Sequence, residues 1–302
     1  MNEPFGDSVR FKDIGARLRA HRLGKELTPD ELAGKLGISR AALYRAEKGE
    51  IRKIDMLTSI ADELGVSLAS LMGVGVEYVS TAIAFFERMR QLEEQCQQII
   101  GLFSPVSYLL TSDNYDTVLR EVLRESVPEG VEAEGTSTKA VEGLLEILRA
   151  RKNAFNSNRP LIVSLIASAD LERFLLHGMI GRHDLPADII DLRRKHARAE
   201  AEFILAMLRS QPIGIQIGIV REPVPATSFQ IFRQADRSML AISPFRLGEQ
   251  PNIRLGVALI TSAPEAMELH EGIAERLWGE ALKGGEAASY LEAMIEKYAI
   301  KR

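Results

Sequence analysis

One short stretch of the chain carries side chains suited to reading double-stranded DNA. Residues 39–50 read SRAALYRAEKGE, and helical spacing places Arg40, Tyr44 and Arg45 on a face that Leu43 does not share. An arginine can bind O6 and N7 of guanine with two hydrogen bonds, and the methyl group of Ala41 can contact the methyl group of a thymine. This stretch is therefore the candidate for contact with base edges in the major groove.

Further basic residues follow this predicted helix. Lys48, Arg52 and Lys53 lie just beyond it in the sequence, where they would approach phosphates and contribute salt-dependent affinity rather than sequence information. For Tyr44 and Arg45 a phosphate contact and a base contact both stay open.

The residues before this helix contain the signals that would position it. In TPDE, Thr28 is predicted to cap a helix with Pro29 at its first position and Glu31 at its third, which is a capping box. Gly37 allows a tight turn, and Ser39 is a favoured cap for the next helix. Two short helices joined by a glycine-containing turn form a helix-turn-helix.

The sequence here resembles a known family. LTPDELAGKLGISRAALYRAEKGE followed by IDMLTSIADELGVSLASLMG is similar to the Cro/CI, or XRE-type, DNA-binding domain. The resemblance implies an all-α helix-turn-helix bundle over residues 1–74 that binds duplex DNA. The residues expected to touch DNA are Thr28, Ser39, Arg40, Ala41, Tyr44, Arg45, Lys48, Arg52 and Lys53. A helical bundle that docks on another protein is the alternative.

The N-terminal region departs from the family pattern in one place. The family usually has a glutamine at the start of the second helix, which helps to anchor a phosphate. Pro29 occupies that position here, so the anchor is missing or is replaced by backbone N–H groups of the helix N-terminus. Arg17 and Arg22 are expected on a solvated helix face, and Glu47 is expected to pair within the domain.

Charge and composition agree with a nucleic-acid-binding end on an ordinary globular chain. The net charge is −4, yet residues 7–53 hold 12 Lys and Arg against 7 Asp and Glu, so the basic charge is concentrated there. There is one cysteine, no long apolar run and no apolar leader, so we expect a cytoplasmic protein with no disulfide, no metal site, no cofactor and no membrane contact.

Residues 75–103 are predicted to form one long linker helix. Apolar residues recur there at alternating spacings of four and three, which is a heptad pattern. A dimerising coiled coil would place Phe85, Met89, Leu92, Cys96 and Ile99 at the dimer interface. An amphipathic helix packed on its own C-terminal domain is the alternative.

Residues 104–302 are predicted to form a mixed α/β domain for effector sensing and dimerisation. Residues 160–168 read as a buried strand, whereas residues 213–220, 228–232, 238–243 and 255–261 alternate and predict an antiparallel meander. The fold class is therefore multidomain, with a helix-turn-helix bundle, a long linker helix and an α/β domain that has a largely antiparallel sheet.

The C-terminal domain lacks the short motifs of common enzymes. There is no Gly-x-Ser-x-Gly elbow, no phosphate-binding Gly-x-x-x-x-Gly-Lys loop and no His-Glu-x-x-His pair. We therefore expect no enzymatic activity, although an enzyme domain tethered to a DNA-binding module is an alternative. Weak candidates for binding a small anionic effector are Arg182, His183, Arg233 and Arg246.

Taken together, these features predict a transcriptional regulator. It would bind a palindromic operator as a homodimer and respond to a small molecule held by the C-terminal domain. The sequence does not distinguish a repressor from an activator.

Overall fold

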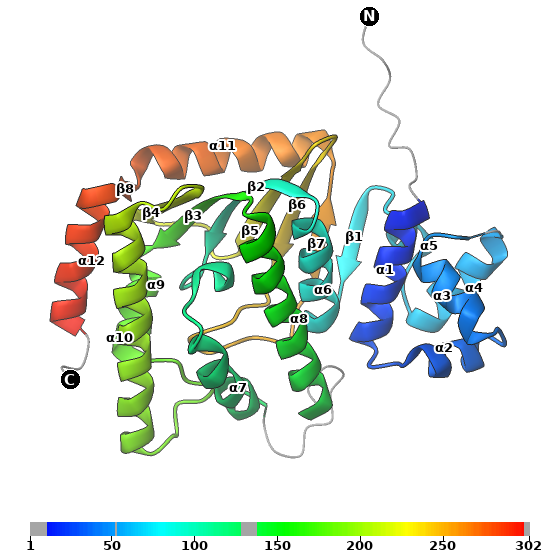
Figure 1. Ribbon diagram of the computed structural model, residues 1–302, viewed down its shortest axis with the longest axis horizontal. Coiled ribbons are helices and arrows are strands. Elements are labelled where there is room, and N and C mark those ends of the chain that lie inside the picture. Colours follow the sequence, from blue (N-terminus) through cyan, green and yellow to red (C-terminus); the bar gives the residue numbers. More distant parts are fainter. Residues whose placement is uncertain (1–10, 52, 128–137, 299–302) are drawn as a thin grey trace, which may run out of the picture.

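The computed structural model describes residues 11–51, 53–127 and 138–298. Its first five helices are α1 (Phe11–Gly24), α2 (Pro29–Lys35), α3 (Arg40–Glu47), α4 (Ile54–Leu64) and α5 (Leu68–Met72). They enclose a small core of their own, in which Leu18, Leu43 and Ile60 are fully buried. This bundle lies at one end of the molecule (Figure 1).

The predicted linker helix over residues 75–103 is wrong. That segment forms strand β1 (Val76–Val79), helix α6 (Ala82–Glu93) and strand β2 (Cys96–Phe103). Ile99 and Ile100 are β-branched, and such residues favour strands over helices. Gly101, which follows them, is unfavourable in a helix interior. The α/β domain therefore begins near residue 76 instead of residue 104.

The residues predicted for a dimer interface belong to the core of one chain. Phe85, Met89 and Leu92 of α6, together with Cys96 and Ile99 of β2, are all at most 9% exposed. They pack in one large apolar cluster with the helices and strands that follow. A coiled coil built from these five side chains is therefore excluded, and their spacing reflects burial within the α/β domain.

The rest of the chain alternates helices and strands. After β2 come a 3₁₀ helix (Tyr108–Leu110), α7 (Tyr115–Glu125), α8 (Thr138–Asn158), β3 (Leu161–Ala167), α9 (Ser168–His177), α10 (Ala187–Ser210) and β4 (Ile215–Val220). The last elements are β5 (Ser228–Gln234), β6 (Ser238–Ser243), β7 (Ala258–Thr261), α11 (Pro264–Glu280), β8 (Leu282–Lys283) and α12 (Gly284–Tyr298).

Within the described ranges, one eight-stranded sheet organises the C-terminal domain. Its strand order is β1-β7-β6-β5-β2-β3-β4-β8. β2, β3 and β4 are parallel neighbours, and every other pairing is antiparallel. The sheet is thus largely antiparallel, as predicted, with a parallel centre produced by the helical crossovers.

The predicted meander is only partly correct. β5, β6 and β7 do follow one another as antiparallel neighbours. β4, however, pairs in parallel with β3, and the chain then crosses back so that β5 pairs with β2. An alternating pattern fixes which face of a strand is buried but not which strand lies beside it.

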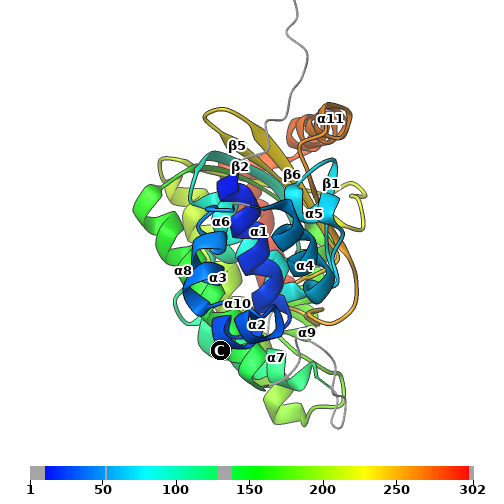
Figure 2. The same ribbon diagram turned by 90° about the vertical axis from the view of Figure 1, so that its right-hand side faces the viewer.

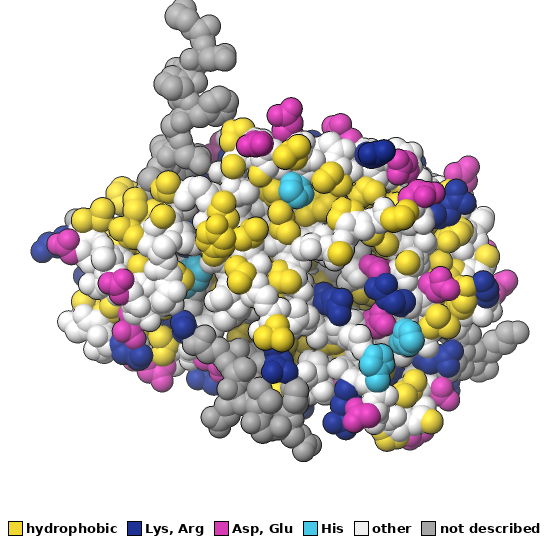
Figure 3. Space-filling model, turned by 180° about the vertical axis from the view of Figure 1, so that it is seen from behind, with side chains coloured by type: hydrophobic (Ala, Val, Ile, Leu, Met, Phe, Trp, Pro, Cys, Tyr) yellow, Lys and Arg dark blue, Asp and Glu magenta, His cyan; other side chains and the backbone are white. Residues whose placement is uncertain are grey.

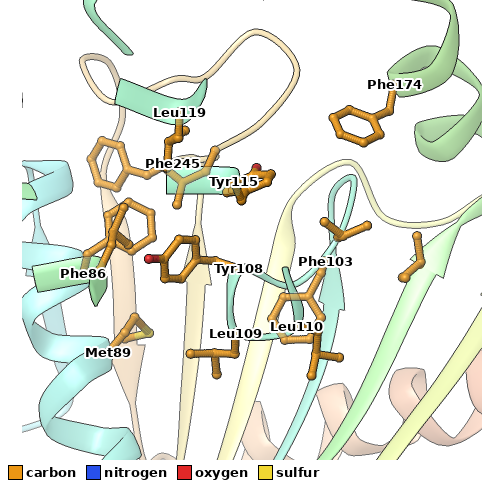
Figure 4. Close-up of a cluster of buried hydrophobic side chains, with 14 of the residues drawn as sticks. Phe86, Met89, Phe103, Tyr108, Leu109, Leu110, Tyr115, Leu119, Phe174 and Phe245 are labelled. Atoms are coloured by element: carbon orange, nitrogen blue, oxygen red, sulfur yellow. The ribbon is translucent and has the colours of Figure 1, made fainter. Parts of the chain in front are cut away.

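Helices cover both faces of the sheet (Figure 1). On one face α11 packs over Leu102, Leu165 and Leu240. The other face carries α6, α7, α8, α9, α10 and α12 and holds the larger core, part of which is seen in Figure 4. Among the residues described, none of the helices has the length and apolar character needed to cross a membrane.

Candidate nucleic-acid interface

The two helices of the turn motif begin at the predicted caps. The Thr28 hydroxyl accepts a hydrogen bond from the Glu31 backbone N–H at 3.2 Å, and the Glu31 carboxylate accepts one from the Thr28 backbone N–H at 2.6 Å. Ser39 Oγ accepts a bond from the Ala42 backbone N–H at 3.2 Å. Gly37, at φ +64°, makes the turn between them. The capping box and the start of α3 are therefore confirmed.

One face of α3 is buried and the other is open. Leu43 and Ala46 are fully buried against the bundle. Arg40, Ala41, Tyr44, Arg45 and Lys48 are all exposed, as is Lys53 at the start of α4. Figure 2 views the molecule from this end and shows α1 to α5 on the near side of the α/β domain. The described part of the chain thus leaves the basic face of α3 free for a partner.

The contacts made by these exposed side chains are weak ones. The Arg40 guanidinium lies 3.3 Å from the Asp30 carboxylate, and both side chains are mostly in solvent. The Lys48 ammonium lies 5.5 Å from the centre of the Tyr44 ring. Exposed pairs of this kind contribute about 0–1 kcal/mol, so a phosphate or a base can displace them. Arg52 lies outside the described residues.

Thr28 is less available for a contact with DNA than its place in the sequence predicts. Its hydroxyl donates to the Glu31 carboxylate at 2.7 Å, in addition to accepting from the Glu31 backbone. Bonds from Thr28 to the carboxylate lower the pKa of Glu31. Because Asp30 and Glu31 bring negative charge to this helix start, it is poorly suited to replace the missing phosphate anchor at Pro29.

Arg17 and Arg22 are not on a solvated face as expected; each is 5% exposed. Arg22 Nε donates to Glu47 at 2.6 Å and Arg22 Nη1 donates to the Leu27 carbonyl at 2.8 Å, so the pair ties α1 to α3. The prediction that Glu47 pairs within the domain is confirmed. The arginine therefore holds the recognition helix in place instead of touching DNA.

Arg17 connects the helical bundle to the α/β domain. Its Nε donates to Glu77 of β1 at 3.0 Å, and the same carboxylate accepts two bonds from Arg88 of α6, at 2.7 and 3.0 Å. Burial alone would raise the pKa of Glu77, but Arg88 and Arg17 hold it below its ordinary value. A buried carboxylate between two arginines thus lies at the domain junction.

Other contacts fix the same junction. The Asp13 carboxylate of α1 accepts a bond from Arg237 at 2.6 Å. The Gln91 amide of α6 donates to the Ala16 carbonyl of α1 at 3.1 Å. At Gly73, φ is +72° and an added Cβ would come within 2.2 Å of the Arg17 guanidinium, so glycine is required where the bundle meets β1. Sequence reasoning missed this junction because its residues lie far apart along the chain.

Two of the four effector candidates meet at one residue. The His183 ring contacts the Gln250 side chain, and Arg246 Nε donates to the Gln250 carbonyl at 3.0 Å. Arg182 lies beside His183 in sequence and pairs with Asp184 at 3.3 Å. Arg233 is elsewhere, bonded to Gln98 at 3.2 Å and to Glu271 at 3.0 Å. The four side chains therefore do not form one site.

Comparison with known families bears on the same N-terminal helices. Residues 13–71 match the family model of a helix-turn-helix domain. This segment is a helix-turn-helix domain. At the level of a helix-turn-helix domain, the match confirms the resemblance to the Cro/CI family. Domains of this kind place their second helix in the major groove of DNA. A search of curated proteins returned no match to the chain.

Proposed function

We propose that this protein is a transcriptional regulator that reads a specific DNA sequence with α3. The observation that carries the proposal is the two-sided character of that helix. Leu43 and Ala46 hold it against the bundle, while Arg40, Tyr44 and Arg45 lie on its open side. Arg40 and Ala41, at the helix start, are the residues expected to reach base edges, since recognition helices contact bases with their N-terminal residues.

Helix α2, the first helix of the motif, carries a carboxylate close to the start of α3. Asp30 lies within reach of Arg40, and a carboxylate near the duplex repels phosphates. In the free protein this pair partly neutralises Arg40, and on DNA the guanidinium would exchange the carboxylate for a base. This exchange costs little free energy, because the ion pair between Arg40 and Asp30 is exposed to solvent.

We propose that the active form is a homodimer on a palindromic operator. A single domain of this size reads few base pairs, and two-fold dimers read half-sites about 34–36 Å apart. Since α6 is buried within one chain, another surface must join the copies. Figure 3 shows hydrophobic side chains gathered in a band across the upper part of the rear face. Val74, Tyr78 and Val257 are among the exposed apolar side chains.

Strand β1 carries one of these exposed apolar side chains. It lies at the end of the strand order and pairs only with β7 among the described strands. The outer edge of β1 faces α5, where Ser70 Oγ accepts a bond from the Tyr78 backbone N–H at 3.1 Å. The Tyr78 side chain itself is 56% exposed, and exposed apolar side chains are common in interaction surfaces. Sedimentation of the wild type and of Tyr78→Lys tests the assignment, which is wrong if both sediment as the same species at every concentration.

Selection of genomic duplex fragments bound by the purified full chain tests the DNA-binding function. The selected fragments should share a palindromic sequence, and affinity for them should fall steeply as salt rises, because bound Lys and Arg release counterions from the duplex. Retention of no fragment at about 50 mM salt would exclude sequence-specific binding.

We further propose that the α/β domain controls DNA binding by responding to a small molecule and that it has no enzymatic role. The buried ion pairs at Glu77 support such coupling, since they connect α6 and β1 to α1 of the helix-turn-helix domain. A ligand shifts this equilibrium only if it binds the two arrangements with different affinity.

A further inference from the structure

A small cavity lies at the carboxyl end of β2. Its volume is about 60 Å³, and its lining includes Phe86 of α6, Ser107 beyond β2, Arg151 of α8, Gln230 of β5 and Arg246 beyond β6. β2 has a parallel neighbour, β3, on one side and an antiparallel neighbour, β5, on the other. In open α/β sheets, ligands commonly bind outside the carboxyl ends of parallel strands.

Two polar atoms of the cavity lining are buried without a partner. Among the described residues, neither Ser107 Oγ nor Gln230 Oε1 has a hydrogen-bond partner, and Ser107 is 1% exposed. Most buried polar groups in proteins are paired, so each exception needs an explanation. The two side chains come from segments far apart in the sequence and line the same cavity, which is the arrangement of a binding site.

The charge of the cavity favours an anion. Arg151 is neutralised by Glu93, which accepts its bonds at 2.9 and 2.6 Å. Arg246 is exposed at the cavity, and within the described residues no carboxylate pairs with it. Its Nε donates to the Gln250 carbonyl at 3.0 Å, and only its backbone pairs with Asn252. The remaining positive charge is therefore available to a carboxylate.

The walls and the size limit the ligand further. Tyr108, Tyr115, Phe86 and Phe245 gather around this part of the core (Figure 4), and all four line the cavity. They suit a short apolar body. A single water needs about 10–15 Å³ of cavity volume, so a cavity of about 60 Å³ admits only a small molecule.

We propose that this cavity binds a short hydroxy acid of the glycolate or lactate class. The carboxylate would accept bonds from Arg246 and Ser107, and the hydroxyl would donate to Gln230 Oε1. An amino acid of the same size fits less well, because its ammonium group would be buried without a free carboxylate. The site rests on the geometry above, and its regulatory role rests on the proposed function.

The cavity lies next to the helix that carries the DNA-binding domain. Phe85 and Phe86 of α6 both line it. On the same helix Arg88 bonds to Glu77, and Ala84 lies beside Gly24 of α1, where an added Cβ would come within 2.9 Å. A ligand that displaced the two rings would therefore act on the packing between α6 and α1.

Calorimetric titration of the full chain, without DNA, tests the site. Lactate or glycolate should bind at least tenfold more tightly than propionate or acetate, which lack the hydroxyl, and more tightly than alanine. Gln230→Met should reduce the affinity for lactate to that for propionate. Ser107→Ala and Arg246→Gln should each weaken lactate binding about tenfold, the loss expected for one charge-assisted or buried hydrogen bond. Arg276→Gln, which replaces an exposed arginine of α11 outside the cavity, is the matched control.

The outcomes separate the cavity from the proposed function. Absence of binding by both hydroxy acids at millimolar concentration overturns the site, as does binding that survives all three cavity substitutions in folded variants. Tighter binding of alanine overturns the hydroxy-acid assignment. A chain that binds lactate but no duplex supports the site and overturns the regulator, whereas a chain that binds duplex and neither acid overturns the site alone.

Discussion

The carboxylate of Glu77 and the guanidinium of Arg17 are joined by a 3.0 Å hydrogen bond across the domain junction, with both side chains almost fully buried. Arg88 shares the same carboxylate. One anion thus holds two cations from the two domains, so removal of the anion leaves two buried charges without compensation.

Glu77→Gln should destabilise the protein by about 3–5 kcal/mol, the range for breaking a buried ion pair by removing one partner. The free energy of unfolding is measured in urea by circular dichroism. Lys35→Ala is the control, because Lys35 pairs with Glu63 at the surface and an exposed pair contributes about 1 kcal/mol or less. Equal losses in the two variants would contradict a special role for the buried carboxylate.

Arg40→Ala should cost about 1–3 kcal/mol of binding free energy on the selected operator and relax the preference at one base pair. The measurement is fluorescence anisotropy with the operator and with single-base variants of it. Equal loss on operator and random duplex would instead assign Arg40 to a phosphate.

Lys53→Ala should weaken binding to all sequences alike, and a changed base preference would argue against its phosphate contact.

His21 should make the protein less stable at mildly acidic pH. It is 6% exposed, its Nε2 has no hydrogen-bond partner among the described residues, and burial lowers its pKa. Well above the ordinary histidine pKa of about 6.5 the ring is neutral in both states. As the pH falls below that value, the unfolded chain takes up a proton that the folded chain resists, so the free energy of unfolding decreases.

The difference between wild type and His21→Gln isolates this contribution. Urea unfolding at about pH 7.5 and about pH 5.5 should show a smaller acid-dependent loss in the variant, because one of the protons taken up on unfolding is gone. The same loss in both proteins would show that other groups account for it, among them His196, whose pKa burial also lowers.

Cys96 should be unreactive in the folded protein. Burial raises the pKa of its thiol to about 12, and its Sγ lies 2.7 Å from the Gln98 carbonyl. The thiolate is the reactive form, so a thiol reagent at about pH 8 should label the native chain far more slowly than the urea-unfolded chain. Rapid labelling of the native protein, or a disulfide-linked dimer under oxidising conditions, would show that this strand is accessible.

The sequence predicts the helix-turn-helix well because its signals are local. Thr28, Pro29 and Glu31 specify one helix start within four residues, and Ser39 specifies another. The exposed face of α3 follows from the position of Leu43. Arg17 and Arg22 are buried against the prediction, because their partners Glu77 and Glu47 lie far away in the sequence and give no local signal.

The segment 76–103 shows the limit of periodicity. Spacings of four and three arise in a coiled coil, but they also arise when a strand, a helix and a second strand are buried in turn. The sheet order and the cavity could not be predicted either, because both depend on which distant segments become neighbours. The sequence does contain one local sign of the cavity: Ser228 and Gln230 lie two residues apart in β5, so both polar side chains point to the same face of the sheet.

Strand β1 follows α5 after only a few residues and is paired with β7. This short connection fixes the position of the helix-turn-helix domain relative to the α/β domain, so the domain cannot move by itself to reach a second half-site. If two copies bind together, the separation of their recognition helices is set by the body of the protein. Operators lengthened by half a helical turn should then lose cooperative binding abruptly, whereas a regulator with a long flexible tether would tolerate the insertion.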